Sequence, residues 1–449
     1  MTTMRRLLLA LVFAAPALAA DGDLDPTFSG DGKVVFGTAA TDPFPHDALL
    51  GPDGALVVVG YGRSGDQPGL DWRRVTAAGA HAACTFVPPN STLSWANAGV
   101  FDGSGRLLVA GFARYDGLGE VAAVARYLYP ACTLDTSFDG DGYATYDESQ
   151  DLRATDLTIS RYWSGIFFVS RIVLAGPWGD PNATPFVAVL SLRFDGTLDT
   201  GFDDDGLRLL NFGGDVMGTR VVASGARILV GATREIGNEG DFSLFALGAE
   251  DGALDTSWGD TGTRLIDFGD GAGFDDDELW AMALDRAGRL LLAGTSSHDG
   301  VSFSPLARLD PAGDPDPTLD GDGELLLPYT SVPLTVTAVA EQSDGKLVLG
   351  GGGSLDGEGA AGALRLHASG AVDPSYGAGG LALHVVDVYP SASGESTYPD
   401  AAVIWGGRTT LVGGSQQPQE NRGFVVRLTA ALVFRDGFEH GSTATWNGF

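Results

Sequence analysis

Pairs of aspartates beside glycines are the residues of this chain whose spacing best suits chemistry. The pairs, two residues apart, are Asp139 and Asp141, Asp203 and Asp205, and Asp320 and Asp322. Oxygen ligands at this spacing, with a glycine for a sharp turn, are typical of calcium loops. A full EF-hand loop needs a distal glutamate that none of these copies supplies. Asp and Gly are also the preferred residues of ordinary turns. We expect turns here and keep calcium as the one candidate cofactor.

Motifs for catalysis are weak by comparison. The six histidines are scattered, without a metal-ligand spacing such as His-Glu-x-x-His. A Gly-x-Ser-x-Gly nucleophile motif does not occur between a predicted strand and a helix. A carboxylate pair for glycoside cleavage could stand among the 58 acidic residues. We therefore assign no catalytic residue and expect no enzyme, while that alternative stays open.

Exposed aromatic residues are the candidates for ligand binding. Three stretches, 60–72, 162–182 and 388–400, depart most from the repeating pattern described next. Inserted loops of a repeat array often carry its binding sites. Trp163, Trp178 and Tyr389 are thus candidates to contact a carbohydrate or a protein. The alternative is that these rings pack within their own loops.

A nine-residue phrase, Leu-Asp-x-x-Phe-x-x-x-Gly, recurs along the chain and must position all of these side chains. Its copies begin at Leu24, Leu134, Leu198, Leu254, Pro315 and Val372. The recurring aspartates are expected to cap a turn by accepting backbone N–H bonds: Asp25, Asp135, Asp199, Asp255, Asp316 and Asp373. The recurring aromatic rings are expected to pack between neighbouring units: Phe28, Phe138, Phe202, Trp258 and Tyr376.

The sequence between successive phrases predicts four β-strands, which together form one repeat unit. A short apolar run follows each phrase, and then comes a hairpin with an Asp-Gly or similar turn, as in 48–60 and 339–350. A further apolar strand, such as 121–127, ends the unit. The phrases recur every 56 to 64 residues, except for a double step after Leu24 that implies a degenerate copy. The fold class is therefore all-β, a seven-bladed β-propeller of four-stranded antiparallel blades. A parallel β-helix is the alternative.

The two cysteines locate the degenerate copy. Cys84 and Cys132 each lie in an Ala-Cys-Thr triplet, and the second triplet directly precedes Leu134. Aligning the triplets places Phe86 at the position of Leu134. A disulfide between neighbouring units is our preferred interpretation, with two separate buried thiols as the alternative.

The phrase, followed by a strand and an Asp-Gly hairpin, resembles the delta-60 repeat family of exported bacterial proteins. The resemblance covers about residues 22 to 428. It implies a β-propeller-like fold and export, and it implies no activity, because that domain has no assigned function.

The two ends of the chain and its net charge indicate where the protein acts and which partners it disfavours. Residues 1–20 read as a signal peptide, with Arg5 and Arg6 before an apolar run and Ala17-Leu-Ala19 at the cleavage site. Residues 21–430 form the predicted propeller, and 431–449 a C-terminal tail that packs outside it, or closes the ring, or serves export or attachment. A net charge of −31 disfavours nucleic acid, and no apolar stretch predicts membrane insertion.

We therefore expect a monomeric protein in the periplasm or outside the cell. Its expected role is a binding or structural module for an unknown protein or carbohydrate. One alternative is a hydrolase or lyase of extracellular polysaccharide with a site at the central channel. The other is a calcium-stabilised surface protein.

Overall fold

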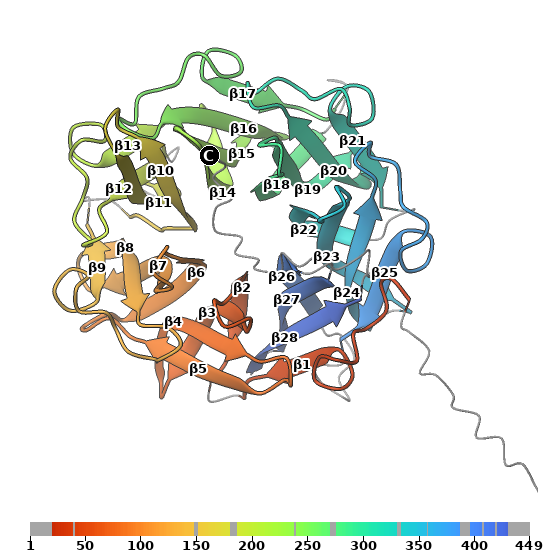
Figure 1. Ribbon diagram of the computed structural model, residues 1–449, viewed down its shortest axis with the longest axis horizontal. Coiled ribbons are helices and arrows are strands. Elements are labelled where there is room, and N and C mark those ends of the chain that lie inside the picture. The colour runs from red at the N-terminus through yellow and green to blue at the C-terminus, as the bar shows by residue number, and fades with distance from the viewer. Residues whose placement is uncertain are drawn as a thin grey trace, which may run out of the picture.

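The computed structural model describes residues 20–38, 41–147, 151–179, 186–237, 239–269, 275–329, 334–356, 358–386, 396–405, 408–417 and 420–429. Every helix or strand in these ranges is a β-strand, and the strands surround one central axis (Figure 1). The chain is thus an all-β propeller. No helix in the described ranges has the length and apolar character needed to span a membrane.

The strands follow one another in sets of four. The first sets are β2 (Phe44–Leu50), β3 (Leu56–Ser64), β4 (Gln67–Val75) and β5 (His81–Phe86); β6 (Leu93–Phe101), β7 (Leu107–Tyr115), β8 (Gly119–Tyr127) and β9 (Tyr143–Tyr146); and β10 (Asp156–Trp163), β11 (Phe168–Trp178), β12 (Phe186–Leu192) and β13 (Leu207–Leu210). Next come β14 (Asp215–Ser224), β15 (Arg227–Ile236), β16 (Glu239–Gly248) and β17 (Thr263–Ile266); and β18 (Asp275–Leu284), β19 (Leu290–His298), β20 (Val301–Leu309) and β21 (Glu324–Pro328). The last are β22 (Leu334–Glu341), β23 (Leu347–Leu355), β24 (Glu358–Leu366) and β25 (Leu381–Val385); and β26 (Ser396–Trp405), β27 (Arg408–Gln417) and β28 (Glu420–Leu428), which β1 (Lys33–Phe36) completes.

Hydrogen bonding joins these strands into six sheets. Five are four-stranded, and in the sixth the sets β14–β17 and β18–β21 are connected into eight strands. That connection is one parallel pair, Gly240 with Asp276, whereas all pairing within the sets is antiparallel. We call each set of four a blade, named by its strands, and the contact between two adjacent blades a seam. The blade that includes β1 is called β26–β1.

The N-terminal strand closes the ring. β1 pairs antiparallel with β28, from Lys33 opposite Val426 to Phe36 opposite Gly423. The red and blue ends of the described chain therefore lie side by side in Figure 1. The strand after each phrase thus belongs to the preceding blade, and our division of the chain at the start of each phrase was wrong. The phrase lies within a blade, between its third and fourth strands, because its turn reverses the chain there. The C-terminal tail lies outside the described residues.

The core lies in the seams. Each buried apolar cluster draws on two adjacent blades; one combines Val124 of β8 and Phe138 with Ile172 of β11, for example. The second and third strands of a blade are buried on both faces, which accounts for continuous apolar runs such as 107–113. The phrase aromatics occupy the same clusters and are at most 2 % exposed, so their predicted packing between units is confirmed.

The blade β2–β5 lacks the phrase, and the alignment of Phe86 with Leu134 was wrong. Leu134 pairs with Tyr127 directly after a turn, whereas Phe86 is at the far end of β5, opposite Leu70. The residue paired like Leu134 is His81, opposite Val75. The two Ala-Cys-Thr triplets therefore occupy different places, one in a strand and one in a turn. A three-residue identity could not decide a register that strand pairing determines.

A disulfide crosses the seam between the blades β2–β5 and β6–β9. Cys84 of β5 is bonded to Cys132, in the turn between β8 and β9, with 5.5 Å between their Cα atoms. Its loop spans 48 residues. The covalent link joins the one described blade that has no phrase to the next blade around the ring.

Candidate functional site

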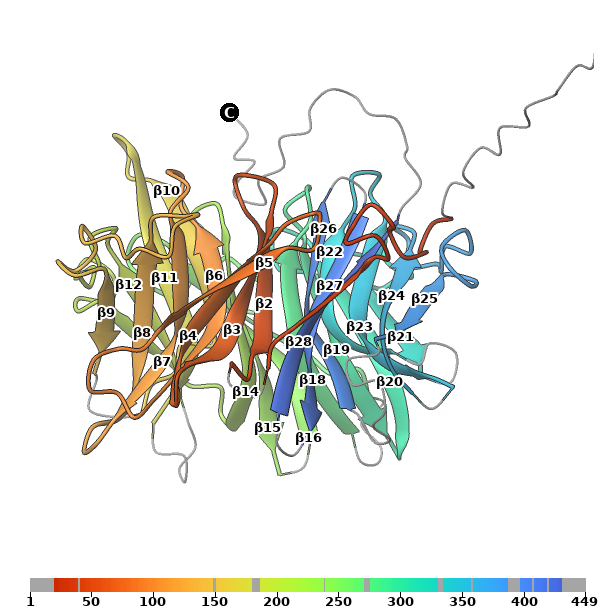
Figure 2. The ribbon, with the colours of Figure 1, turned by 90° about the horizontal axis from the view of Figure 1, so that it is seen from below.

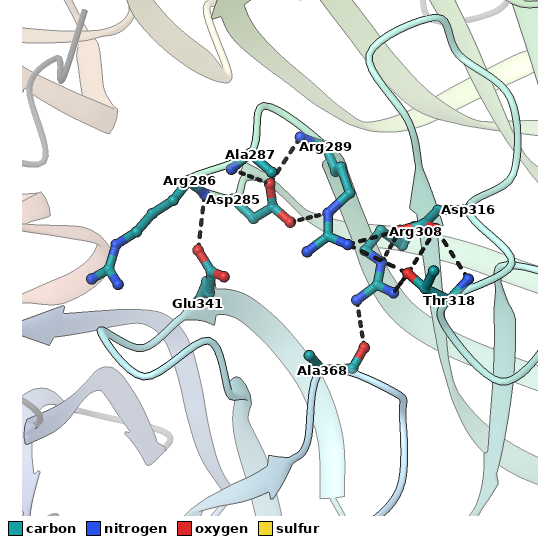
Figure 3. A network of polar contacts seen from close by, with 9 residues as sticks. All are labelled: Asp285, Arg286, Ala287, Arg289, Arg308, Asp316, Thr318, Glu341 and Ala368. Atoms are coloured by element: carbon teal, nitrogen blue, oxygen red, sulfur yellow. Dashed lines mark hydrogen bonds and ion pairs between the residues drawn. The ribbon is translucent and has the colours of Figure 1, made fainter. Parts of the chain in front are cut away.

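Each phrase aspartate caps its turn, as the sequence predicts. Asp316 Oδ1 accepts hydrogen bonds from the Thr318 N–H at 3.0 Å and the Thr318 hydroxyl at 2.7 Å (Figure 3). The same geometry recurs at the aspartates Asp25, Asp135, Asp255 and Asp373. Two residues after Asp199 stands Gly201, which has no hydroxyl, so only a long backbone bond of 3.5 Å remains.

The other carboxylate oxygen receives cationic side chains that the sequence analysis did not assign. Asp316 Oδ2 is 2.7 Å from Nε of Arg308 in the third strand and 2.9 Å from Nη1 of Arg289, just before the second strand. Figure 3 shows both guanidinium groups converging on this carboxylate. We call this arrangement the Asp–Arg clamp. Two cations also meet Asp25, Asp135, Asp199 and Asp373, and one meets Asp255.

The clamp extends to the next blade. Arg308 is fully buried and donates from Nη1 to the carbonyl oxygen of Ala368, in the turn between β24 and β25. Arg126 reaches the carbonyl of Phe194 in the same way, and its guanidinium lies 4.9 Å from the centre of the Phe138 ring. One charged network therefore connects two strands, a turn and the adjacent blade. Its residues are already fully engaged with one another, so the clamp is a structural element.

The predicted calcium residues serve turns. Asp139, Asp203 and Asp320 have left-handed backbone angles of 48° to 50°, a conformation that Asp tolerates better than most residues. Their N–H groups donate to a carbonyl of the next blade. Asp141, Asp205 and Asp322 each accept the N–H two residues on. The first three residues therefore serve the turns through their backbone, and the last three through their carboxylates. None belongs to the group of metal-capable side chains found within the described ranges, which is Asp275, Asp277 and His298.

The predicted aromatic residues do not form one site. Trp163 is at the tip of the β10–β11 hairpin, 55 % exposed, and its ring contacts Phe168 edge-on at 5.1 Å. Trp178 is at the opposite end of β11, partly buried against Phe186 and the core. Tyr389 lies outside the described residues. The stretch 60–72 is no loop, because β3 and β4 pair through to Ser64 opposite Gln67.

Charged side chains around the central axis break the repeat, and sequence comparison of the units could have found them. In the innermost strands Asp47, Asp156 and Arg220 occupy the position at which Ala98, Ala281 and Ala338 stand in other blades. Asp47 Oδ2 accepts the N–H of Gly99 in β6, and Asp156 Oδ2 accepts that of Val221 in β14, each at 2.8 Å.

Further polar contacts join successive inner strands. Together with those of Asp47 and Asp156, we call these contacts the inner belt. Arg220 Nε donates to the carbonyl of Trp280 in β18 at 2.9 Å, and Asn97 Nδ2 to that of Ala154 at 2.7 Å. His46 accepts on Nε2 from the indole N–H of Trp95 at 2.5 Å. Burial, followed by the charge of Arg220, lowers the pKa of His46 to about 4, so that the imidazole is neutral. The belt connects β2, β6, β10, β14 and β18 and thereby uses most of the polar atoms it contains.

A pocket of about 310 Å³ lies between the blades β18–β21 and β22–β25. Its lining is rich in acids, hydroxyls and aromatic rings: Asp276, Glu278, Thr295, Ser296, Ser297, Ser302, Phe303, Tyr329, Leu334 and Thr335. Glu278 Oε2 accepts from the Thr295 hydroxyl at 2.9 Å and from the Trp280 indole at 3.2 Å. Burial, and then repulsion by Glu278, raise the pKa of Asp276. The lining comes from the strand ends away from the clamps, since Asp276 is the second residue of β18, whereas Arg289 of the clamp lies beyond the other end of that strand, just before β19. Figure 2 shows the blades in profile between these two faces.

Comparisons with known proteins agree with the fold. Residues 288–319 and 342–376 match the family model described as "Domain of unknown function (DUF5122) beta-propeller". Each matched segment contains one clamp, with Arg289, Arg308 and Asp316 in the first and Lys346, Arg365 and Asp373 in the second. The match confirms the resemblance to a propeller family without an assigned function. No curated protein matches the chain.

Three solved structures are similar to this chain at low identity, with TM-scores below 0.5. A polysaccharide lyase, Uly1, is 10 % identical with a TM-score of 0.47, covering 89 % of this chain and 98 % of its own. Semaphorin 2a of Drosophila is 9 % identical with a TM-score of 0.49, covering 88 % and 74 %. Sqt1 of Chaetomium thermophilum, bound to the N-terminus of ribosomal protein L10, is 11 % identical with a TM-score of 0.44, covering 88 % and 99 %.

The clamp predicts the effect of Asp316→Asn. Burial alone would raise the pKa of Asp316, but the Thr318 hydrogen bonds and the Arg308 charge lower it to about 2. The variant leaves the buried Arg308 without its counter-charge, and we expect it to lower the free energy of unfolding by about 3–5 kcal/mol at pH 7.

The same carboxyl group predicts a pH dependence in the wild type. Because the pKa of Asp316 is lower in the folded chain, its charge stabilises the fold above the unfolded value of 3.8, and this contribution is lost as the pH falls towards 2. Denaturant unfolding at pH 7 and near pH 2 measures both effects. Asp66→Asn, in the exposed β3–β4 turn, is the control, and an equal loss in the two variants would contradict the clamp.

The inner belt predicts a pH dependence of the opposite sign. Burial is the main cause that raises the pKa of Asp47 to about 7, and the charge of Asp156 adds to it. Because the folded chain holds this proton more tightly than the unfolded chain, its contribution to stability is greatest below pH 3.8 and declines up to pH 7. We expect Asp47→Asn to lose less stability than the wild type between pH 4 and pH 7 in guanidinium titrations. Identical slopes for the two proteins would show that Asp47 is ionised throughout.

Proposed function

We propose that this chain is an exported, seven-bladed β-propeller that binds neutral saccharides in the pocket between β18–β21 and β22–β25. The blade count treats β14–β17 and β18–β21 as two blades, because a single parallel residue pair connects them. Export is supported by the signal-like N-terminus and by the Cys84–Cys132 disulfide, since such bonds persist in oxidising compartments.

The lining of this pocket is the observation that carries the proposal. The carboxylates of Asp276 and Glu278 can accept hydrogen bonds from sugar hydroxyls, and the hydroxyls of Ser297, Ser302 and Thr335 can donate or accept. The rings of Phe303 and Tyr329 offer apolar faces to the C–H groups of a sugar ring. Its volume of about 310 Å³ is at the lower end of ligand pockets and suits a group the size of one or two sugar rings.

Charge selects among saccharides. Two carboxylates line the pocket, and the whole chain carries a net charge of −31. Glycans that bear uronate or sulfate groups would be repelled, especially at low ionic strength. Neutral sugars avoid this repulsion, and a sugar with a protonated amine would be attracted by the two carboxylates.

A polysaccharide hydrolase or lyase is the second candidate, favoured by the acids Asp47 and Asp156 near the central axis. The raised pKa of Asp47, about 7, would suit a general acid. Both oxygens of each carboxylate, however, already accept backbone N–H bonds. Binding without cleavage therefore agrees better with the contacts of these side chains.

A glycan array tests the proposal. The full chain should bind neutral oligosaccharides in preference to uronate-containing or sulfated ones. Glu278→Gln and Tyr329→Ala should each weaken the affinity for the best array ligand at least tenfold in calorimetry, because each removes a contact inside the pocket. Trp163→Ala, at the exposed hairpin tip, should leave the affinity unchanged.

Three results would count against this function. They are an array without any bound glycan, a preference for anionic glycans, and loss of binding in Trp163→Ala but not in Glu278→Gln. Thermal unfolding of each variant separates lost binding from lost structure. Release of reducing or unsaturated ends from a bound polysaccharide, abolished by Asp47→Asn, would favour the enzyme instead.

A further inference from the structure

Three side chains with metal-binding groups meet at the open end of the β18–β19 hairpin. Asp275 pairs with His298 across the two strands, and Asp277 lies two residues further along the same face of β18. His298 Nε2 is 2.9 Å from Asp275 Oδ1 and 3.6 Å from Asp277 Oδ1. The ligand atoms of all three residues lie within 4.8 Å of one another.

Asp277 is an unusual residue for its position. At the equivalent position in other blades stand the buried residues Ser94, Leu152, Val216 and Leu334. Asp277 is itself fully buried. Its Oδ2 accepts the N–H of Phe268 at 2.8 Å, but its Oδ1, which faces His298, makes no hydrogen bond. Burial of a carboxylate oxygen without a hydrogen bond is costly, and the 3.6 Å ion pair with His298 offsets this cost only in part, so a further compensating group would stabilise the site.

A positive group would stabilise this site best, because further acids surround it. Asp267 and Glu324 are close enough to act electrostatically on this site, which adds two further carboxyl groups. His298 is the cation-forming side chain that pairs with these acids among the described contacts. The local charge balance is therefore negative in a place largely shielded from water.

We propose that Asp275, Asp277 and His298 bind one divalent transition-metal ion such as Zn²⁺. Imidazole nitrogen with carboxylate oxygen is a ligand set for such ions, whereas Ca²⁺ takes six to eight oxygens. Metal–ligand bonds of about 2.0–2.1 Å place neighbouring ligand atoms roughly 3.0–3.4 Å apart. The two separations from His298 Nε2, 2.9 and 3.6 Å, bracket this range. The Ser296 hydroxyl, 2.8 Å from the same nitrogen, is a further oxygen at the site.

The ion would strengthen one seam of the ring. Asp277 holds the backbone of Phe268, which follows β17, so its position links the blades β14–β17 and β18–β21. This is the seam at which Gly240 and Asp276 pair. Asp276 and Glu278 point to the other face of β18, into the pocket, by strand alternation. The metal site therefore adjoins the saccharide pocket, since Ser296 borders both, but its three ligands Asp275, Asp277 and His298 are not part of the pocket lining.

Metal titration of the full chain, stripped with a chelator and then dialysed, tests this site. We expect one Zn²⁺ per chain by elemental analysis, and a higher unfolding temperature with Zn²⁺ that Ca²⁺ does not produce. Co²⁺ should give visible absorption bands of a bound ion. His298→Asn should reduce Zn²⁺ affinity at least tenfold and remove the Co²⁺ bands, because it removes the nitrogen ligand from a partly exposed position.

A matched control separates this site from adventitious binding. His367 is 3.9 Å from Asp373, in a similar His–Asp pair without a third ligand, and His367→Asn should retain one Zn²⁺. Asp277→Asn should also lose the ion; if it fails to fold, His298→Asn alone decides. Zn²⁺ binding that survives His298→Asn, absence of Zn²⁺ binding, or a Ca²⁺ response that requires His298 would each overturn the proposal. Glycan binding that persists in His298→Asn would leave the proposed function intact.

Discussion

The pairing of one buried aspartate with two cations is the interaction on which the ring depends. Asp316 contacts the start of the second strand through Arg289, the third strand through Arg308, and through Thr318 its own turn, which leads to the fourth strand. Charge-assisted hydrogen bonds with fixed guanidinium geometry are directional. They therefore fix the conformation of the turn between the third and fourth strands. Burial of apolar side chains alone would specify this turn only loosely. We infer that this buried network contributes more to a unique arrangement of the blade than to its net stability.

The same interaction closes the ring. Asp25, in the first phrase, pairs with Arg408 and Arg427 near the other end of the described chain, at 2.9 and 2.8 Å. The contact is thus identical in kind to those within continuous blades. In the blade β2–β5 the phrase is missing, and the Cys84–Cys132 bond crosses the seam to β6–β9. We infer that the covalent link takes the place of the absent clamp.

The repeat predicted much of this architecture, and its limits have physical reasons. Recurrence of Asp316 and its equivalents predicts a cap, because the acceptor and its donor are two residues apart. The arginine partners were missed, although Arg126 stands in the predicted strand 121–127, because their contacts cross between strands. The alignment through Phe86 failed because three shared letters do not determine strand register.

The candidate sites were harder to predict than the fold. Asp275, Asp277 and His298 meet only through cross-strand pairing, so they match no contiguous motif. The pocket draws on five strand ends from two blades. One signal was present in the sequence: charged residues at positions where other units have alanine or leucine, such as Asp47 and Asp277. Aligning the units by strand register, and not by the phrase, reveals both.

Hydrogen exchange on the oxidised and the reduced chain tests most directly whether each seam is held by either an Asp–Arg clamp or the disulfide. If the disulfide replaces a clamp, reduction should increase exchange of the amides in β5 and β9. The amides of β21 and β25, beside intact clamps, should keep their protection. Equal increases in all blades, or unchanged exchange in β5 and β9, would contradict the account.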